Sequence, residues 1–217
     1  MSHDRPLTPQ LPSTPPGQTP ASVRLAMPVE ALQIAEIQRR AWLADPAQKP
    51  FLAQVSLDEM AEVWHAAIVR PPLAHFRVLV ATEPTGRPEA TDAPDQTRLA
   101  QRVVGFAAIG PSDDPDAGPR DAEVAEFIID AMGRDRGHGS RLMNAVVDTM
   151  RADGYLRAVW WLRTTDDGLR GFLEGAGWAP DGAHRELSTD DESVTIKQVR
   201  LHSDISEHSD ISEPGAH

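Results

Sequence analysis

The residues best suited to chemistry lie in one Gly- and Arg-rich segment of the chain, Arg134-Asp135-Arg136-Gly137-His138-Gly139-Ser140. A short apolar stretch from Val124 to Ile129 precedes this segment, and an amphipathic stretch follows it. A strand that enters such a loop and a helix that leaves it direct consecutive backbone N–H groups to one point, at the positive end of the helix. Because Arg134 and Arg136 add two guanidiniums, the segment predicts a binding site for a pyrophosphate.

Two familiar pyrophosphate motifs do not fit the segment. The Walker A motif ends in Gly-Lys-Ser or Gly-Lys-Thr, whereas this chain has Gly139-Ser140-Arg141. The dinucleotide fingerprint needs a third glycine, where Leu142 stands. It also needs an acid after the next strand, where this chain has Trp160-Trp161-Leu162-Arg163. A third kind of Gly-rich site is therefore needed.

The spacing Arg134-x-x-Gly137-x-Gly139 resembles the signature with which GNAT-type N-acetyltransferases hold the pyrophosphate of acetyl-CoA. Glu123 begins the preceding strand, as a Glu often does in that family. A second resemblance is the run Gly171-Phe172-Leu173-Glu174-Gly175-Ala176-Gly177-Trp178, which is similar to the family's short helix ending in Gly and an aromatic residue. The likeness covers about residues 22 to 201. It implies an α/β (α+β) fold with a mixed, mostly antiparallel central sheet of six to seven strands and helices on both faces.

The order of apolar patterns along the chain is consistent with such a sheet. Period-two and apolar runs predict strands at 23–27, 75–82, 102–109, 123–129, 156–162, 184–188 and 194–201. Helical spacing and capping signals predict helices at 28–42, 56–69, 137–153 and 169–176. Residues 83–101 are rich in Pro, Gly, Thr and Asp, so they are predicted to form a long hairpin loop.

Two predicted tails flank one acetyltransferase domain at residues 21–201. Residues 1–20 are rich in Pro, Thr, Ser and Gln and are expected to be disordered. At the other end the hexapeptide His202–Glu207 is repeated at once as His208–Glu213. Because each copy has a single apolar residue and cannot build a core, residues 202–217 are predicted to be a second disordered tail.

The composition excludes several classes of function. The net charge of −12 opposes binding to nucleic acid and favours amines or other cationic partners. The absence of cysteine excludes disulfides, thiolate metal sites and a Cys nucleophile. No group of His, Asp and Glu has metal-ligand spacing, so no metal is expected.

Neither a signal sequence nor a membrane span is found, which gives a cytoplasmic location as the expectation. The oligomeric state is left open, with a homodimer as the commonest arrangement.

The resemblance implies which residues hold acetyl-CoA, the acetyl donor. The backbone amides at the start of the helix and two arginines would bind its pyrophosphate, and small residues would let it approach. The strand before the loop would splay from its neighbour, so that the pantetheine pairs with free backbone and one amide polarises the thioester carbonyl. Asp166 stands where relatives often have an Asn beside the cofactor. The predicted cofactor residues are Ile129, Ala131, Arg134, Arg136, Gly137, His138, Gly139, Ser140 and Asp166.

The resemblance identifies the catalytic residues less closely than the cofactor-binding residues. Glu123 occupies the place where several members of the family keep the base that deprotonates the amine, and Glu126 is the alternative. Regular strand alternation would put the two on opposite faces, so that only one enters the cleft unless a bulge intervenes. Leu173 stands where many relatives have a Tyr that protonates the leaving thiolate, and the general acid is therefore unassigned.

The predicted activity is N-acetylation of a primary amine, on a small molecule or a protein, by direct attack in a ternary complex. The acceptor site would come from residues 43–55 and the last hairpin. The missing Tyr leaves a non-catalytic acyl-CoA sensor or scaffold as an alternative. A second alternative is an interaction module whose tails are the working parts.

Overall fold

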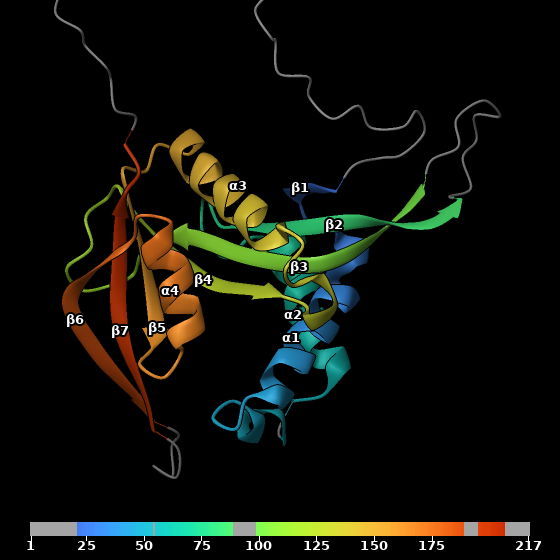
Figure 1. Cartoon of the computed structure of the whole chain (residues 1–217), viewed down its shortest axis with the longest axis horizontal. Coiled ribbons are helices and arrows are strands. Elements are labelled where there is room, and N and C mark those ends of the chain that lie inside the picture. The colour runs from blue at the N-terminus through green and yellow to red at the C-terminus, as the bar shows by residue number, and fades with distance from the viewer. Residues whose placement is uncertain (1–20, 54, 89–98, 189–194, 207–217) are drawn as a thin grey trace, which may run out of the picture.

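The computed structural model describes residues 21–53, 55–88, 99–188 and 195–206. Within these ranges the chain forms a seven-stranded sheet in the order β1-β2-β3-β4-β5-β7-β6, with four α-helices (Figure 1). The strands are β1 Ser22–Leu25, β2 Arg77–Pro88, β3 Leu99–Pro111, β4 Asp121–Ile129, β5 Arg157–Arg163, β6 Ala179–Ser188 and β7 Thr195–Asp204. The helices are α1 Ala31–Ala44, α2 Leu57–Val69, α3 His138–Ala152 and α4 Asp167–Gly175, with short 3-10 turns at Pro28–Glu30, Lys49–Ala53 and Ala131–Gly133.

The helices cover both faces of the sheet, as the fold class predicts. On one face, apolar residues of α3 and α4 pack with Leu79, Ala107 and Val124. On the other face, α1 and α2 pack with Val78, Val80 and other residues that alternate with the first set along the strands. Every neighbouring pair of strands is antiparallel except β4 and β5. The predicted mixed, mostly antiparallel sheet is therefore confirmed.

The prediction of a loop at residues 83–101 is wrong at both ends. β2 continues to Pro88 and β3 begins at Leu99, and Glu83 pairs with Arg102 across the two strands. The polar composition of this segment concealed the strands, because a ladder of backbone bonds and a cross-strand ion pair need no apolar side chains. Residues 89–98, the rest of the predicted loop, lie outside the described residues.

The predicted domain boundary at residue 201 is too early. The first copy of the hexapeptide completes β7, where His202 pairs with Val159 and Asp204 pairs with Arg157. Ile205 then enters the core with 1% of its surface exposed, and its backbone N–H donates to Leu156 O at 2.8 Å. One apolar residue per hexapeptide suffices here because the neighbouring elements supply the rest of the core.

The two copies of the hexapeptide allow a matched test of this packing. Replacing Ile205 with Ala is expected to lower the free energy of unfolding by about 2–5 kcal/mol, because a fully buried aliphatic side chain leaves a cavity. Chemical denaturation would measure the loss. Ile211→Ala, the same change in the second copy, is the control, and an equal loss at Ile211 would contradict the assignment of the core position to the first copy.

Residues 1–20 and the second copy of the hexapeptide, which were predicted to be disordered, lie outside the described residues. None of the described helices combines the length and the apolar character that a bilayer span requires.

Candidate functional site

The site begins where β4 and β5 separate. The two strands pair in parallel at only three positions, from Asp121 with Arg157 to Glu123 with Val159. Beyond Glu123, β4 continues to Ile129 and β5 to Arg163 without further pairing to each other, and Figure 1 shows the two strands running apart. The splay implied by the resemblance is therefore present. It leaves backbone groups along the second half of β4 unpaired on the side facing β5, where an extended ligand could bind.

The loop after β4 turns tightly into α3. Asp130 N donates to Val104 O at 2.9 Å, and Gly133 packs so closely on Val104 that an added Cβ would lie 3.1 Å from the Val104 carbonyl oxygen. Gly137, the residue that caps α3, has a φ of 76°, a conformation that glycine adopts without steric cost. The first amides of a helix have no acceptors within the helix, so those after Gly137 are free to bind an anion.

Gly139 brings the loop, β4 and α4 together at one point. A Cβ added to Gly139 would lie 3.8 Å from Cγ1 of Ile129 and 3.8 Å from Cζ of Phe172. A single methyl group would therefore fit in ordinary contact, whereas a large side chain would fill the space between the loop and its neighbours. The structure thus places two of the predicted cofactor residues, Ile129 and Gly139, next to each other.

The basic side chains of the loop differ in their contacts. Arg134 is exposed, and the structure gives it no ion pair with any described residue. Arg136 is also exposed, but its Nη1 lies 2.8 Å from an oxygen of Glu83 on β2. His138 is turned into the protein, with 3% of its surface exposed and its Nε2 3.3 Å from Glu83. Only the backbone of His138 can therefore face the predicted phosphate site.

The remaining predicted cofactor residues lie near the same point with different roles. Ala131 and Ser140 are exposed at the two ends of the loop. Asp166 caps α4, where its Oδ1 accepts from Leu169 N at 3.0 Å. This capping bond gives Asp166 a structural role, and its contact with a cofactor stays a prediction. Leu173, which the resemblance aligns with the family's Tyr, is fully buried in the core.

A bulge in β4 puts Glu123 and Glu126 on the same face. Ile109 pairs with Val124 and the adjacent Ala108 pairs with Glu126, so Ala125 has no partner on β3. Val124 points to the α3 side of the sheet, which directs Glu123 to the opposite side. Glu126 also lies on that side, since Gln38 of α1 donates to it at 3.0 Å. The expectation from regular alternation, that the two acids face opposite ways, is wrong because the extra residue shifts the alternation.

The surroundings of Glu123 raise its pKa to about 7. Burial is the largest cause, and the charges of Asp114 and Asp113 act in the same direction against the opposing charges of Arg185 and Arg200. A carboxyl with a pKa near neutrality exchanges protons readily at physiological pH. The structure thus gives Glu123 the property expected of a general base.

Glu126 is held by a chain of hydrogen bonds from α2. Trp64 Nε1 donates to Oε1 of Gln38 at 2.8 Å, and Gln38 Nε2 donates to Glu126. Because an indole N–H can only donate, it fixes the orientation of the Gln38 amide, whose NH2 group must face Glu126. Burial raises the pKa of Glu126, while the Gln38 hydrogen bond and the Phe127 backbone oppose that effect.

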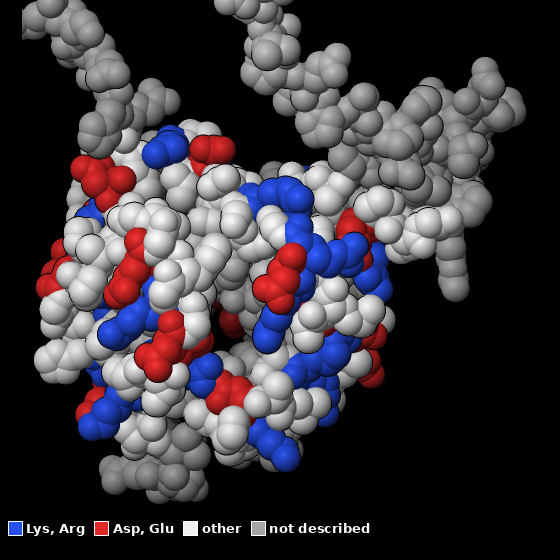
Figure 2. Space-filling view, in the orientation of Figure 1, with Lys and Arg blue, Asp and Glu red and all other residues white. Residues whose placement is uncertain are grey.

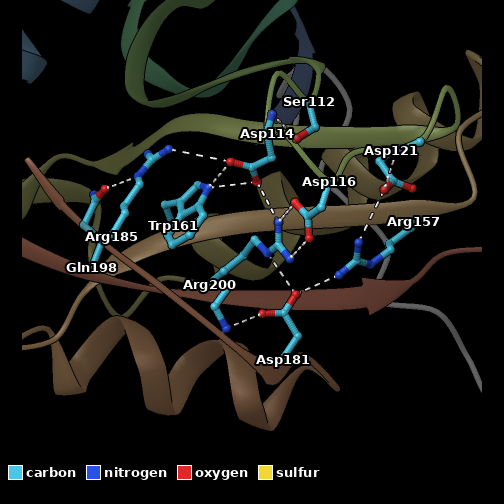
Figure 3. Close-up of polar contacts among 12 residues, drawn as sticks. Ser112, Asp114, Asp116, Asp121, Arg157, Trp161, Asp181, Arg185, Gln198 and Arg200 are labelled. Atoms are coloured by element: carbon cyan, nitrogen blue, oxygen red, sulfur yellow. Dashed lines mark hydrogen bonds and ion pairs between the residues drawn. The ribbon is translucent and has the colours of Figure 1, made fainter.

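A buried arginine anchors the loop beside Glu123. Arg200 on β7 contacts Asp114 at 3.0 Å, Asp116 at 2.6 Å and Asp181 at 2.8 Å (Figure 3). Trp161 Nε1 also donates to both oxygens of Asp114 at 3.0 Å. The hydrogen bond that Arg200 donates to Asp116 lowers the pKa of Asp116 to about 2. Loop 112–120, which links β3 to β4, is therefore tied to the β6–β7 hairpin.

Three carboxylates lie close together at this place, two from adjacent residues of loop 112–120 and one from β4. Oxygens of Asp113, Asp114 and Glu123 lie within 4.8 Å of one another. Spacing alone could not reveal this group, because it forms only when loop 112–120 folds back on β4. Both oxygens of Asp114 already accept hydrogen bonds from Trp161 and one also contacts Arg200, so the arrangement suits charge tuning of Glu123 better than ligation of a cation.

Figure 2 shows that the surface is hollowed at the centre of this face, between the side formed by α4 and the side formed by α1 and α2. Acidic atoms are visible at the bottom of the hollow, and basic side chains surround part of its rim. The arrangement offers an anion-binding loop at one end of a splayed strand and two acids at the other.

The comparisons with known proteins agree with this geometry. Residues 33–178 match the model of the acetyltransferase (GNAT) family. The fold is similar to that of an N-acetyltransferase from Staphylococcus aureus Mu50, with a TM-score of 0.63 and 18% identity over 87% of this chain and 100% of that one. It is also similar to yncA from Salmonella typhimurium, solved with its cofactor acetyl-CoA (TM-score 0.61, 17% identity, 88% and 97% covered). A third similar structure is a ribosomal-protein-alanine N-acetyltransferase from Brucella melitensis (TM-score 0.59, 14% identity, 84% and 98% covered). No curated protein matches the sequence.

Proposed function

The chain belongs to the GNAT acetyltransferase family, and we propose that it transfers the acetyl group of acetyl-CoA directly to a primary amine of a small molecule or a protein. The observation that carries this proposal is that β4 provides both the candidate base and the backbone that would bind the donor. Before its bulge, β4 carries Glu123, whose pKa is about 7, and after the bulge its unpaired backbone leads into the anion-binding loop. Base and donor site thus lie on one strand.

The donor is held by the loop and the end of β4. The backbone amides of residues 136–140, with the helix dipole behind them, bind the pyrophosphate, and Arg134 adds a charged contact. The pantetheine pairs with free backbone near Ile129 and Ala131. The amide of Ile129 donates to the thioester carbonyl and stabilises the negative charge that develops on its oxygen.

The acids prepare the acceptor. An alkyl ammonium has a pKa near 10.4, so it must lose a proton before it attacks. Glu126, fixed by Gln38, accepts a hydrogen bond from the ammonium, and Glu123 takes the proton. The amine nitrogen then attacks the carbonyl carbon and a C–N bond forms. The C–S bond breaks with its electron pair leaving on sulfur, and the nitrogen releases its second proton to water, which leaves the neutral amide.

The leaving thiolate needs no side chain to protonate it. Leu173 occupies the position of the family's Tyr, and Tyr155, the only tyrosine in the sequence, is packed in the core near His75. A thiol has a pKa near 8.5, so its thiolate is an adequate leaving group and takes its proton from water. The same observation at Leu173 favours the alternative function, an acyl-CoA sensor that binds the donor without turnover.

Calorimetric titration with acetyl-CoA tests the donor site. The wild type is expected to bind saturably, and Gly139→Trp is expected to abolish binding because the indole fills the space between the loop, Ile129 and Phe172. Gly175→Trp is the control, since an added Cβ there meets nothing within 4 Å. A wild type that does not bind acetyl-CoA would overturn the proposal, and equal binding by both variants would place the donor elsewhere.

A further inference from the structure

A buried acid lies beneath the phosphate loop and takes no part in the reaction proposed above. Glu83 on β2 has only 8% of its side chain exposed. A buried carboxylate is costly unless it is paired, so its partners show which part of the structure it stabilises. One partner is Arg102, its neighbour across the sheet on β3.

The other partners of Glu83 come from the loop itself. Arg136 Nη1 lies 2.8 Å from Oε2 of Glu83, and the buried His138 places its Nε2 3.3 Å from the same oxygen. These two residues flank Gly137, whose left-handed conformation begins α3. Arg141 closes the network, since its Nη1 lies 3.3 Å from the Arg136 carbonyl oxygen and 3.5 Å from Nδ1 of His138. The Glu83 carboxylate thus holds the chain on both sides of Gly137, where the chain turns so that the free backbone N–H groups at the start of α3 face one point.

We propose that Glu83 is a positioning residue, which fixes the diphosphate-binding conformation of loop 134–140 by holding Arg136 and His138 on either side of Gly137. The inference rests on the proposed function, because acetyl-CoA supplies the diphosphate. It also revises the role of Arg136, which serves first as the link between the loop and Glu83. Arg134, which has no ion pair with a described residue, is then the guanidinium available to the ligand.

Electrostatics alone predicts the opposite effect from positioning. A negative charge close to an anion site repels the ligand, so a Glu83 without a positioning role would weaken binding. Burial favours the neutral form of Glu83, but the hydrogen bond from Arg102 and the charges of Arg136 and Arg102 keep its pKa below the ordinary value, so the charge is present at neutral pH. The sign of the change in affinity on neutralising Glu83 therefore distinguishes the two effects.

Glu83→Gln is the decisive variant, measured by calorimetric titration with acetyl-CoA. Positioning predicts that the Kd rises about tenfold, the loss expected when a hydrogen bond to a charged group is broken. An unchanged or lower Kd would overturn the inference. Glu186→Gln is the matched control, because it removes the same charge from an exposed ion pair with Lys197 and should leave the Kd unchanged.

A variant of the other side of the contact keeps the test informative if Glu83→Gln is poorly folded. His138→Gln retains a polar side chain in the network and is expected to weaken binding in the same direction. The loss of affinity in the double variant Glu83→Gln/Arg136→Met should be smaller than the sum of the two single losses, since Glu83 acts in part through Arg136. Additive losses would overturn the inference. A wild type that fails to bind acetyl-CoA would instead contradict the proposed function, so the two failures are distinguishable.

Discussion

Replacing Glu123 with Gln is expected to lower kcat by about 100- to 10,000-fold, the usual contribution of a positioned general base. The affinity for acetyl-CoA should not change, because Glu123 lies before the bulge and outside the donor site. In the wild type, kcat/KM for an amine acceptor should fall as the pH drops below about 7, where burial and the nearby Asp114 and Asp113 keep Glu123 protonated. Steady-state kinetics over a panel of amines would measure both effects.

The control for this variant is Glu126→Gln, which should raise KM for the acceptor more than it lowers kcat. A wild-type rate that is zero for every amine, with acetyl-CoA still bound, would favour the acyl-CoA sensor.

The stability of the protein provides a second test of the pKa of Glu123. The folded-state pKa of Glu123 lies above its ordinary value of 4.5, so the protein loses stability as the pH rises from about 4.5 to about 7, where the unfolded chain releases this proton first. Glu123→Gln should therefore melt at a higher temperature than the wild type at pH 8 and at the same temperature near pH 4.

Replacing Arg200 with Met is expected to cost about 3–5 kcal/mol of stability, because it removes a buried guanidinium from the carboxylates of Asp114 and Asp181. For a chain of this size, the loss corresponds to a fall of about 10 °C in Tm. The variant should also lose activity, since Asp114 is the neighbour that helps set the pKa of Glu123. Calorimetry and kinetics on the same preparation would measure the two effects.

Asp116→Asn is the matched control for Arg200. Asp116 contacts the same guanidinium at 2.6 Å, but 62% of its side chain is exposed. An exposed ion pair contributes less than about 1 kcal/mol, so this variant should melt close to the wild type. An equal fall in Tm for the two variants would show that the buried partners of Arg200 contribute no more than the exposed one.

The loop of the proposed donor site could be predicted because its parts are contiguous in the sequence. Arg134, Gly137 and Gly139 lie close together in the chain, and their spacing resembles the pyrophosphate-binding signature of the family. The strand before the loop and the helix after it follow from apolar periodicity. The order of strands and the covering of both faces then follow from the resemblance to the family, and the structure confirms them.

The parts of the site that depend on distant contacts could not be predicted. Glu83 reaches the loop only because β2 continues into a segment whose composition indicates a loop. Arg200 meets Asp114 through the pairing of strands that are far apart in the chain. Ile205 enters the core although its hexapeptide, read by itself, is polar. In each case tertiary contacts outweigh local composition.

The unpaired Ala125 also changes how the two acids would be recognised in other chains. On a regular strand, two side chains that share a face are separated by one residue, but the bulge requires two residues between Glu123 and Glu126. A sequence with the pattern Glu-x-x-Glu at the end of this strand therefore carries both acids in the cleft only if it also carries the bulge. Deleting the single residue Ala125 would restore regular pairing and leave one residue between the two acids, so both carboxylates would still share a face without a bulge.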